Sequence, residues 1–131
     1  LRDKYREIGS LAWEEAVADG AFYDLMYFNE DNPQFDSQKI YAYIRHTENQ
    51  KLLFVANFSE EEKQIQVKIP IHAFEMMGME AIAVITFQKF GDDEFHSNLR
   101  IEKVVESGVE MIVEGFDYKI MKLNDKKPEK T

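Results

Sequence analysis

The spacing of hydrophobic positions changes once along the chain, near residue 20. Before that point, apolar side chains recur three or four residues apart, at Leu1, Tyr5, Ile8, Leu11 and Ala12, with Trp13 at the end of the stripe. Positions with this spacing share one face of a helix, so the pattern predicts a short helix over the first dozen residues. The chain begins at Leu1 and enters this helix directly, and we therefore expect it to be part of a longer protein.

After Asp19-Gly20 the pattern becomes that of β-strands. Apolar residues either alternate with polar ones or run together in short stretches bounded by turn residues. The predicted strands cover residues 21–28, 39–46, 51–58, 63–69, 81–87, 99–105, 109–114 and 116–120. Between the fourth and fifth strands, residues 71–78 predict a turn of helix or an irregular plug.

Two kinds of strand are distinguishable, and together they predict the fold. The apolar runs at 51–58 and 81–87 are continuous, which is typical of central strands covered on both faces. The stretches at 63–69 and 109–114 alternate strictly, which indicates one buried face and one solvated face. About eight such strands predict an all-β, antiparallel β-sandwich preceded by a short N-terminal helix. The prediction requires burial of four side chains: Leu53, Val55, Ile82 and Val84.

The chain is expected to divide near residue 20. Residues 1–19 would be the end of a preceding helix with its connector, and residues 20–131 a β-sandwich domain. A chain of 131 residues with 13% aromatic residues has enough apolar area to form one hydrophobic core.

The charge and the lack of cysteine exclude several classes of function. Sixteen basic residues against 25 acidic ones give a formal net charge of −9. An acidic surface repels phosphate groups, which argues against a nucleic-acid partner or an anionic membrane. With no cysteine, the chain has no disulfide scaffold, thiolate metal site or cysteine nucleophile.

Acidic residues are plentiful, and a glycosidase-type pair is one chemistry they could support. Such a pair needs two carboxyl groups about 5–10 Å apart across a sugar-sized cleft. Most acids here lie in turns or alternate outward on strands, and only Asp24 is embedded in an apolar run. We favour a solvated or backbone-capping role for Asp24.

The patterns that suggest ligand binding are better explained structurally. His46, His72 and His96 lie far apart in the sequence and share no zinc-site spacing. Residues 29–32 (Asn-Glu-Asp-Asn) lack the glycine and terminal glutamate of a calcium loop and predict a turn. Residues 57–59 (Asn-Phe-Ser) match the glycosylation pattern, but a side-chain hydrogen bond to a neighbouring turn is favoured. No metal ion and no cofactor is predicted.

Five segments carry a resemblance to a known family. They are residues 20–29 (GAFYDLMYFN), 39–45 (KIYAYIR), 52–59 (LLFVANFS), 67–70 (VKIP) and 109–123, which has a glycine turn before an aromatic-rich last strand. In this order and spacing they resemble the C-terminal all-β domain of the α-amylase family of glycoside hydrolases. The departures are a longer plug at 71–79 and a longer loop at 91–98.

The resemblance implies an accessory role. In that family the catalytic acids stand at the strand ends of a (β/α)8 barrel, and this chain has neither an Asn-His-Asp run nor an Arg-x-Asp strand. No catalytic residue carries over. The implied function is a non-catalytic domain that packs on the catalytic barrel of the same polypeptide and stabilises it, in the breakdown of α-glucans such as starch and maltodextrin.

Two other functions stay open. One is an independent carbohydrate-binding β-sandwich module that stacks exposed aromatic side chains on α-glucan. The other is a small hydrolase that uses Asp24 or another acid. The apolar helix stripe is a possible interface with the barrel or with a second copy in a homodimer of the isolated fragment, through Leu1, Tyr5, Ile8, Leu11 and Trp13.

Overall fold

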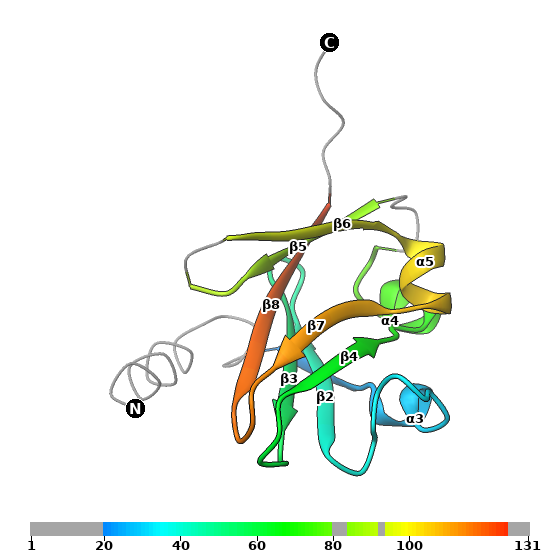
Figure 1. The fold of residues 1–131 in the computed structure, drawn as a ribbon. Coiled ribbons are helices and arrows are strands. Elements are labelled where there is room, and N and C mark those ends of the chain that lie inside the picture. The colour runs from blue at the N-terminus through cyan, green and yellow to red at the C-terminus, as the bar shows by residue number, and fades with distance from the viewer. Residues whose placement is uncertain (1–19, 80–83, 92–93, 126–131) are drawn as a thin grey trace.

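The computed structural model describes residues 20–79, 84–91 and 94–125, drawn in colour in Figure 1. Eight strands within these residues are Ala21–Asp24 (β1), Ile40–His46 (β2), Lys51–Asn57 (β3), Lys63–Val67 (β4), Val84–Lys89 (β5), Phe95–Arg100 (β6), Val109–Val113 (β7) and Tyr118–Asp125 (β8). Three short helices are Met26–Asn29 (α3), Ile71–Met76 (α4) and Ile101–Glu106 (α5). In this part of the chain no helix is long and apolar enough to cross a membrane.

The strands form two antiparallel sheets, which confirms the predicted sandwich-like all-β fold. The larger sheet has six strands in the order β1-β2-β3-β8-β5-β6, and the smaller one pairs β4 with β7. Figure 1 shows the β4–β7 pair crossing the larger sheet, and β7 contacts β3. The two expected central strands, β3 and β5, both lie inside the six-stranded sheet, as predicted.

The main core lies between the two sheets. Leu53 and Val55 of β3 are fully buried in it, as predicted, and β7 buries alternate residues along its whole length. Ile82 lies outside the described residues. Val84 is only half-buried, because β5 instead turns Ile85 and Phe87 into the core.

Strand β5 also differs from the prediction of two covered faces. Its buried and half-buried residues alternate, whereas β3 buries Leu52 and Phe54 on one face and Leu53 and Val55 on the other. The described part of the 81–87 segment therefore has one buried face and one partly exposed face. Polar Thr86 occupies the other face of β5. The segment 81–87 is apolar at all its other positions, and the sequence pattern therefore suggested two buried faces.

Two predicted strands are partly helical. The aromatic run at 21–28 breaks after Asp24, whose Oδ1 accepts the backbone N–H of Met26 at 2.9 Å. Helix α3 begins at Met26. The predicted strand at 99–105 is wrong: β6 ends at Arg100 and α5 follows. Ile101 and Val104, three residues apart, are both buried, and this spacing fits one face of a helix. The helical turn expected within 71–78 is confirmed as α4.

Candidate functional site

The outer face of the six-stranded sheet, which points away from β4 and β7, carries a second apolar cluster. Side chains alternate between the two faces of a strand, and the neighbours of the core residues therefore point outward. The register aligns Tyr43 of β2, Phe54 of β3 and Ile120 of β8 in one row across this face. Buried Leu52, Phe54, Phe90 and Ile120 form the cluster, with Tyr43 and Tyr118 packed against it.

Aromatic rings continue this cluster to the sheet edge at β1. Tyr43 stacks on Phe54 with ring centroids 4.8 Å apart and planes 2° from parallel, and it also contacts Phe22 at 5.1 Å and Tyr41 at 5.6 Å. Burial raises the pKa of the Tyr43 phenol, while nearby Arg45 opposes that shift. Phe22 and Tyr41 remain 52% and 39% exposed. We call Phe22, Tyr41, Tyr43 and Phe54 the aromatic strip.

The other end of the same face is polar. Thr86 Oγ1 lies 2.7 Å from Asn98 Oδ1 across β5 and β6, and Asn124 Nδ2 donates to Gln88 Oε1 at 2.7 Å across β8 and β5. The outer face is therefore divided between apolar rings on β1, β2 and β3 and hydrogen-bonded polar side chains on β5 and β6. An exposed apolar area of this kind marks a surface that contacts another layer of structure.

A cavity adjoins the apolar cluster where β8 extends beyond the end of β5. Strand β5 ends at Lys89, opposite Met121, and the N–H of Phe90 donates to the Ile120 carbonyl at 2.9 Å. Residues 118 and 119, at the start of β8, lie beyond this end of β5 and pair with β3. The resulting cavity has a volume of about 410 Å³ and ten lining residues: Lys89, Glu94, Phe95, His96, Glu114, Asp117, Tyr118, Lys119, Ile120 and Met121. The lining residues include exposed Phe95, two lysines and three acidic residues.

His96 joins the cavity wall to the smaller sheet. Its Nδ1 lies 2.9 Å from Ser97 Oγ, and its imidazole ring forms a hydrogen bond with the backbone of Glu110 in β7. Burial lowers the pKa of His96, and the positive charge of Lys119 lowers it further. The imidazole is therefore held in its neutral form at neutral pH.

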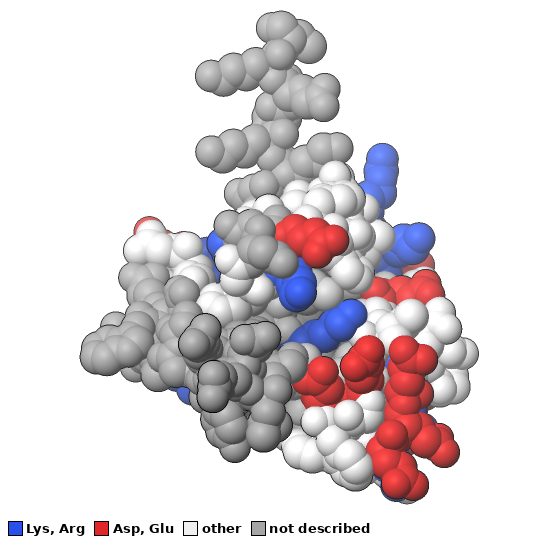
Figure 2. Space-filling model, turned by 60° about the vertical axis from the view of Figure 1, so that its left-hand side comes forward, with Lys and Arg blue, Asp and Glu red and all other residues white. Residues whose placement is uncertain are grey.

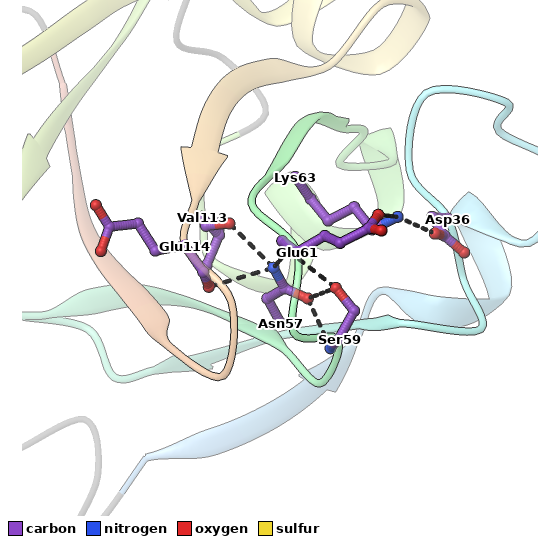
Figure 3. A network of polar contacts seen from close by, with 7 residues as sticks. All are labelled: Asp36, Asn57, Ser59, Glu61, Lys63, Val113 and Glu114. Atoms are coloured by element: carbon purple, nitrogen blue, oxygen red, sulfur yellow. Dashed lines mark hydrogen bonds and ion pairs between the residues drawn. The ribbon is translucent and has the colours of Figure 1, made fainter.

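The Asn-Phe-Ser segment is structural, as expected. Figure 3 shows the Asn57 amide at the centre of a polar network. Its Nδ2 donates to the backbone oxygens of Glu61, Val113 and Glu114 at 2.8, 3.0 and 3.2 Å. Its Oδ1 accepts the backbone N–H and the hydroxyl of Ser59 at 2.9 and 2.8 Å. Asn57 thereby joins the β3–β4 turn to the β7–β8 turn.

The calcium-like segment is also a turn, as expected. Asn32 N–H donates to the Asn29 carbonyl, and both side chains are buried. The Asn29 amide pairs with Lys68 at two points, donating to its carbonyl and accepting its N–H at 2.9 and 2.8 Å. Asn32 donates to the Gln66 carbonyl in the same way. The side-chain amides of Asn29 and Asn32 thus hydrogen-bond to the backbone of Gln66 in β4 and of Lys68 just after it, in place of a backbone ladder.

The other candidate residues do not converge on one place. Asp24 is exposed and its Oδ1 accepts the backbone N–H of Met26, which fits the solvated or backbone-capping role favoured from the sequence. His46 is buried at the end of β2, where burial lowers its pKa. His72 of α4 contacts the Tyr23 hydroxyl at 2.9 Å. Among the described residues no three His, Cys, Asp or Glu side chains are grouped so as to hold a metal ion.

The predicted interface stripe, Leu1, Tyr5, Ile8, Leu11 and Trp13, lies outside the described residues. The aromatic strip and the cavity were not found from the sequence. Tyr41 and Tyr43 lie within the strand predicted at 39–46. Their alternation with Ile40, Ala42 and Ile44 was the available signal, since it places aromatic rings where a solvated face would carry polar residues.

Figure 2 shows how charge is distributed over one side of the molecule. Acidic side chains gather at the lower right of this view, and several basic side chains stand above them and in the centre. On this side of the molecule the acidic side chains are thus gathered in one area, with basic side chains next to them.

Comparison with known families finds a similar β domain. The family model described as the alpha-amylase SusG C-terminal domain matches residues 40–77. This stretch contains β2, β3, β4 and α4, including the Asn-Phe-Ser segment. The resemblance to the C-terminal domain of the α-amylase family is confirmed. No curated protein matches the chain.

Solved structures share the fold. The α-amylase from Geobacillus thermoleovorans, in complex with acarbose, aligns over 87% of this chain and 20% of its own, with 12% identity and a TM-score of 0.53. A putative α-N-acetylgalactosaminidase from Bacillus halodurans aligns over 72% of this chain and 19% of its own, with 15% identity and a TM-score of 0.54. The chain thus spans about a fifth of the length of each enzyme.

Proposed function

We propose that this chain is the non-catalytic C-terminal domain of an α-amylase-type glycoside hydrolase, and that it stabilises the catalytic barrel of the same polypeptide by packing on it. The observation that carries the proposal is the aromatic strip on the outer face of the six-stranded sheet. The smaller sheet covers only the inner face. An antiparallel sheet that is apolar on both faces favours a second layer on the outer one.

The leading residues belong to the same proposal. Residues 1–19 would connect the barrel to the β domain formed by residues 20–131, with the stripe of Leu1, Tyr5, Ile8, Leu11 and Trp13 facing the barrel. Phe22, at the start of the β domain, follows this segment directly in the chain and lies in the aromatic strip. The stripe and the strip would then form one continuous apolar contact.

The test uses the longer polypeptide in which this chain follows a barrel. The double variant Phe22→Asp/Tyr41→Asp places two charges on the proposed contact, where each would be buried without a partner. We expect the temperature of half-inactivation on starch to fall by several degrees. Phe58→Asp is the matched control, because Phe58 is 67% exposed and follows β3 outside the strip. Equal inactivation temperatures in wild type and double variant would refute the packing role.

The absence of catalysis has its own test. The 131-residue chain, incubated with starch, maltodextrin and a chromogenic α-glucoside, should release no product above the buffer blank. The hydrogen bond of Asp24 supports this expectation, because its Oδ1 already accepts the Met26 N–H. Product that disappears in Asp24→Asn would instead establish the small hydrolase. The parent polypeptide, not this chain, would act on α-glucans.

A further inference from the structure

We propose that one end of the sandwich, formed by the β3–β4 turn (residues 58–62) and the β7–β8 turn (residues 114–117), binds a basic polypeptide segment of another protein. Arginine or lysine side chains of that segment would contact the phenyl rings of Phe58 and Phe116 and pair with glutamates of the same turns. Figure 1 shows the two turns at the lower end of the molecule. Both phenylalanines lie outside the aromatic strip, and the proposal therefore does not depend on packing against a barrel.

The two phenyl rings are exposed and stand on turns that are held together. Phe58 and Phe116, at 67% and 73%, are the most exposed large apolar side chains of the residues that the structure describes. The Phe116 N–H donates to the carbonyl of Ser59, the residue after Phe58, at 2.9 Å. The Asn57 amide also donates to a carbonyl of each turn, as Figure 3 shows. The two rings therefore project from neighbouring backbone segments.

Neither burial nor backbone conformation accounts for phenylalanine at position 116. The N–H of Asp117 donates to the Glu114 carbonyl at 3.2 Å, which makes Phe116 the third residue of a four-residue turn. Its φ of +52° lies in the left-handed region, which glycine, asparagine and aspartate adopt more readily than bulky residues. A strained residue with an exposed apolar side chain is typical of a surface that contacts a partner.

The charge of the two turns determines the sign of the partner. All four of their glutamates are exposed: Glu60, Glu61, Glu62 and Glu114. Neither turn contains a lysine or arginine; adjoining Lys63 pairs with Asp36 at 3.2 Å, and Lys39, whose carbonyl accepts the Phe58 N–H, is one positive charge against four negative ones. A nucleic acid or an anionic membrane would be repelled. A second copy docked through the same end would bring like charges together. A basic segment is complementary.

A basic side chain fits both the rings and the glutamates. The cation of arginine or lysine is attracted to the face of a phenyl ring, and at an exposed site this contact is equivalent to about two- to fivefold in affinity. The methylene groups of the same side chain pack on apolar surface while its charged end reaches a carboxylate. Because the carboxylates are exposed, the ion pairs are screened by salt, and binding should weaken as the salt concentration rises.

The experiment is an NMR titration of the ¹⁵N-labelled 131-residue chain with the capped peptide Arg-Leu-Arg-Leu-Arg and, separately, with Glu-Leu-Glu-Leu-Glu. We expect only the arginine peptide to shift the amide signals of residues 58–62 and 114–117. Phe116→Asn removes one ring and places a residue that tolerates the left-handed conformation. It should weaken binding about two- to fivefold while the melting temperature stays the same or rises. A ring needed for stability would give a lower melting temperature.

Two matched controls separate this site from general attraction to an acidic chain. Phe95→Ala removes another exposed phenyl ring, on β6, and should leave the affinity unchanged. Glu60→Gln/Glu62→Gln should weaken binding more than Glu102→Gln/Glu106→Gln, which removes two exposed charges from α5.

Four results would overturn the proposal. The arginine peptide could leave the signals of the two turns unshifted. Phe116→Asn could bind as tightly as wild type or melt at a lower temperature. The two glutamine pairs could weaken binding equally, which would indicate general electrostatic attraction. The same signals could shift when the chain is concentrated without peptide, which would make a second copy the occupant.

Discussion

At the scale of single residues, buried asparagine amides join segments that no backbone ladder connects. Asn57 is 1% exposed and takes part in five hydrogen bonds, three of them donated by Nδ2 to backbone carbonyls. An amide fits this site because it carries both a donor and an acceptor group. Without the amide, the buried Val113 carbonyl and the part-buried carbonyls of Glu61 and Glu114 would lose these donors, and unsatisfied buried groups cost free energy.

The first prediction concerns this amide. Asn57→Asp replaces the donating Nδ2 by an oxygen that faces three carbonyl oxygens. We expect the free energy of unfolding to fall by about 3 kcal/mol, measured by urea denaturation at pH 7. Asn124→Asp is the matched control, since Asn124 is exposed and its Nδ2 donates to the Gln88 side chain. A similar loss in both variants would contradict the assigned role of Asn57.

The second prediction concerns pH. Burial lowers the pKa of both His46 and His96 below the ordinary value of 6.5, so the folded state binds protons less readily than the unfolded chain. Their contribution to stability is complete above pH 6.5 and is lost as the pH falls through their folded-state pKa values. The urea midpoint should therefore decrease between pH 7.5 and pH 5.5.

The matched variant is His46→Gln/His96→Gln, which removes both titrating groups. Its urea midpoint should change less than that of wild type over the same pH interval. The interval stays above the ordinary pKa values of Asp and Glu, which keeps carboxylate titration small. An equally steep decline in the double variant would assign the acid sensitivity to other groups.

At the scale of elements, two turns are in close contact at one end of the sandwich. A Cβ added to Gly115 would collide with the backbone of Glu60, between the β7–β8 and β3–β4 turns. The N–H of Phe116 donates to the Ser59 carbonyl at 2.9 Å and holds the same pair of turns together. Glycine is thus required at position 115 by close approach of another chain segment.

The third prediction follows from this contact. Gly115→Ala should lower the free energy of unfolding by about 2–3 kcal/mol, because backbone on both sides must shift. Gly91→Ala is the control: its φ of +104° also disfavours a side chain, but nothing lies within 4 Å of the added Cβ. We expect Gly91→Ala to cost about 1 kcal/mol. Thermal unfolding of the two variants separates steric overlap from backbone strain.

How far the sequence predicts each element depends on how many structures its pattern fits. The strict alternation in β4 and β7 fits only a strand with one buried face, and both were predicted. The segment at 99–105 fits a strand and a helix equally well, because Ile101 and Val104 can share a helix face. Its short length gave no means of choosing between the two.

The candidate site was less predictable than the fold. The aromatic strip depends on rings from β1, β2 and β3, and the cavity depends on where β5 ends relative to β8. Strand order and register create both, and neither follows from spacing along one segment. A side-chain hydrogen bond from Asn57 to a turn was predictable, because Asn and Ser near a strand end favour turns. The identity of the second turn, which lies 56 and 57 residues further along the chain, was not predictable.

At the scale of the whole molecule, the aromatic strip leaves apolar rings on the outside of a small acidic domain. Phe22 and Tyr41 lie at the edge of the strip nearest the start of the β domain. The apolar stripe of the preceding residues 1–13 would be exposed as well unless another surface covered it. Exposed apolar side chains such as Phe22 and Tyr41 favour contact with the domain itself, with a barrel or with a second copy of the chain.

The last prediction distinguishes these contacts by removing residues 1–13. Burying four side chains such as Leu1, Tyr5, Ile8 and Leu11 would stabilise the chain by several kcal/mol, at about 1.5–3 kcal/mol each. We expect the truncated chain to melt at a lower temperature than the intact one. Light scattering on both then assigns the contact: an unchanged monomer mass places the helix stripe on its own domain, whereas a change from dimer to monomer places it on a second copy. Two monomers with equal melting temperatures would show that the stripe contributes no stability to the chain by itself.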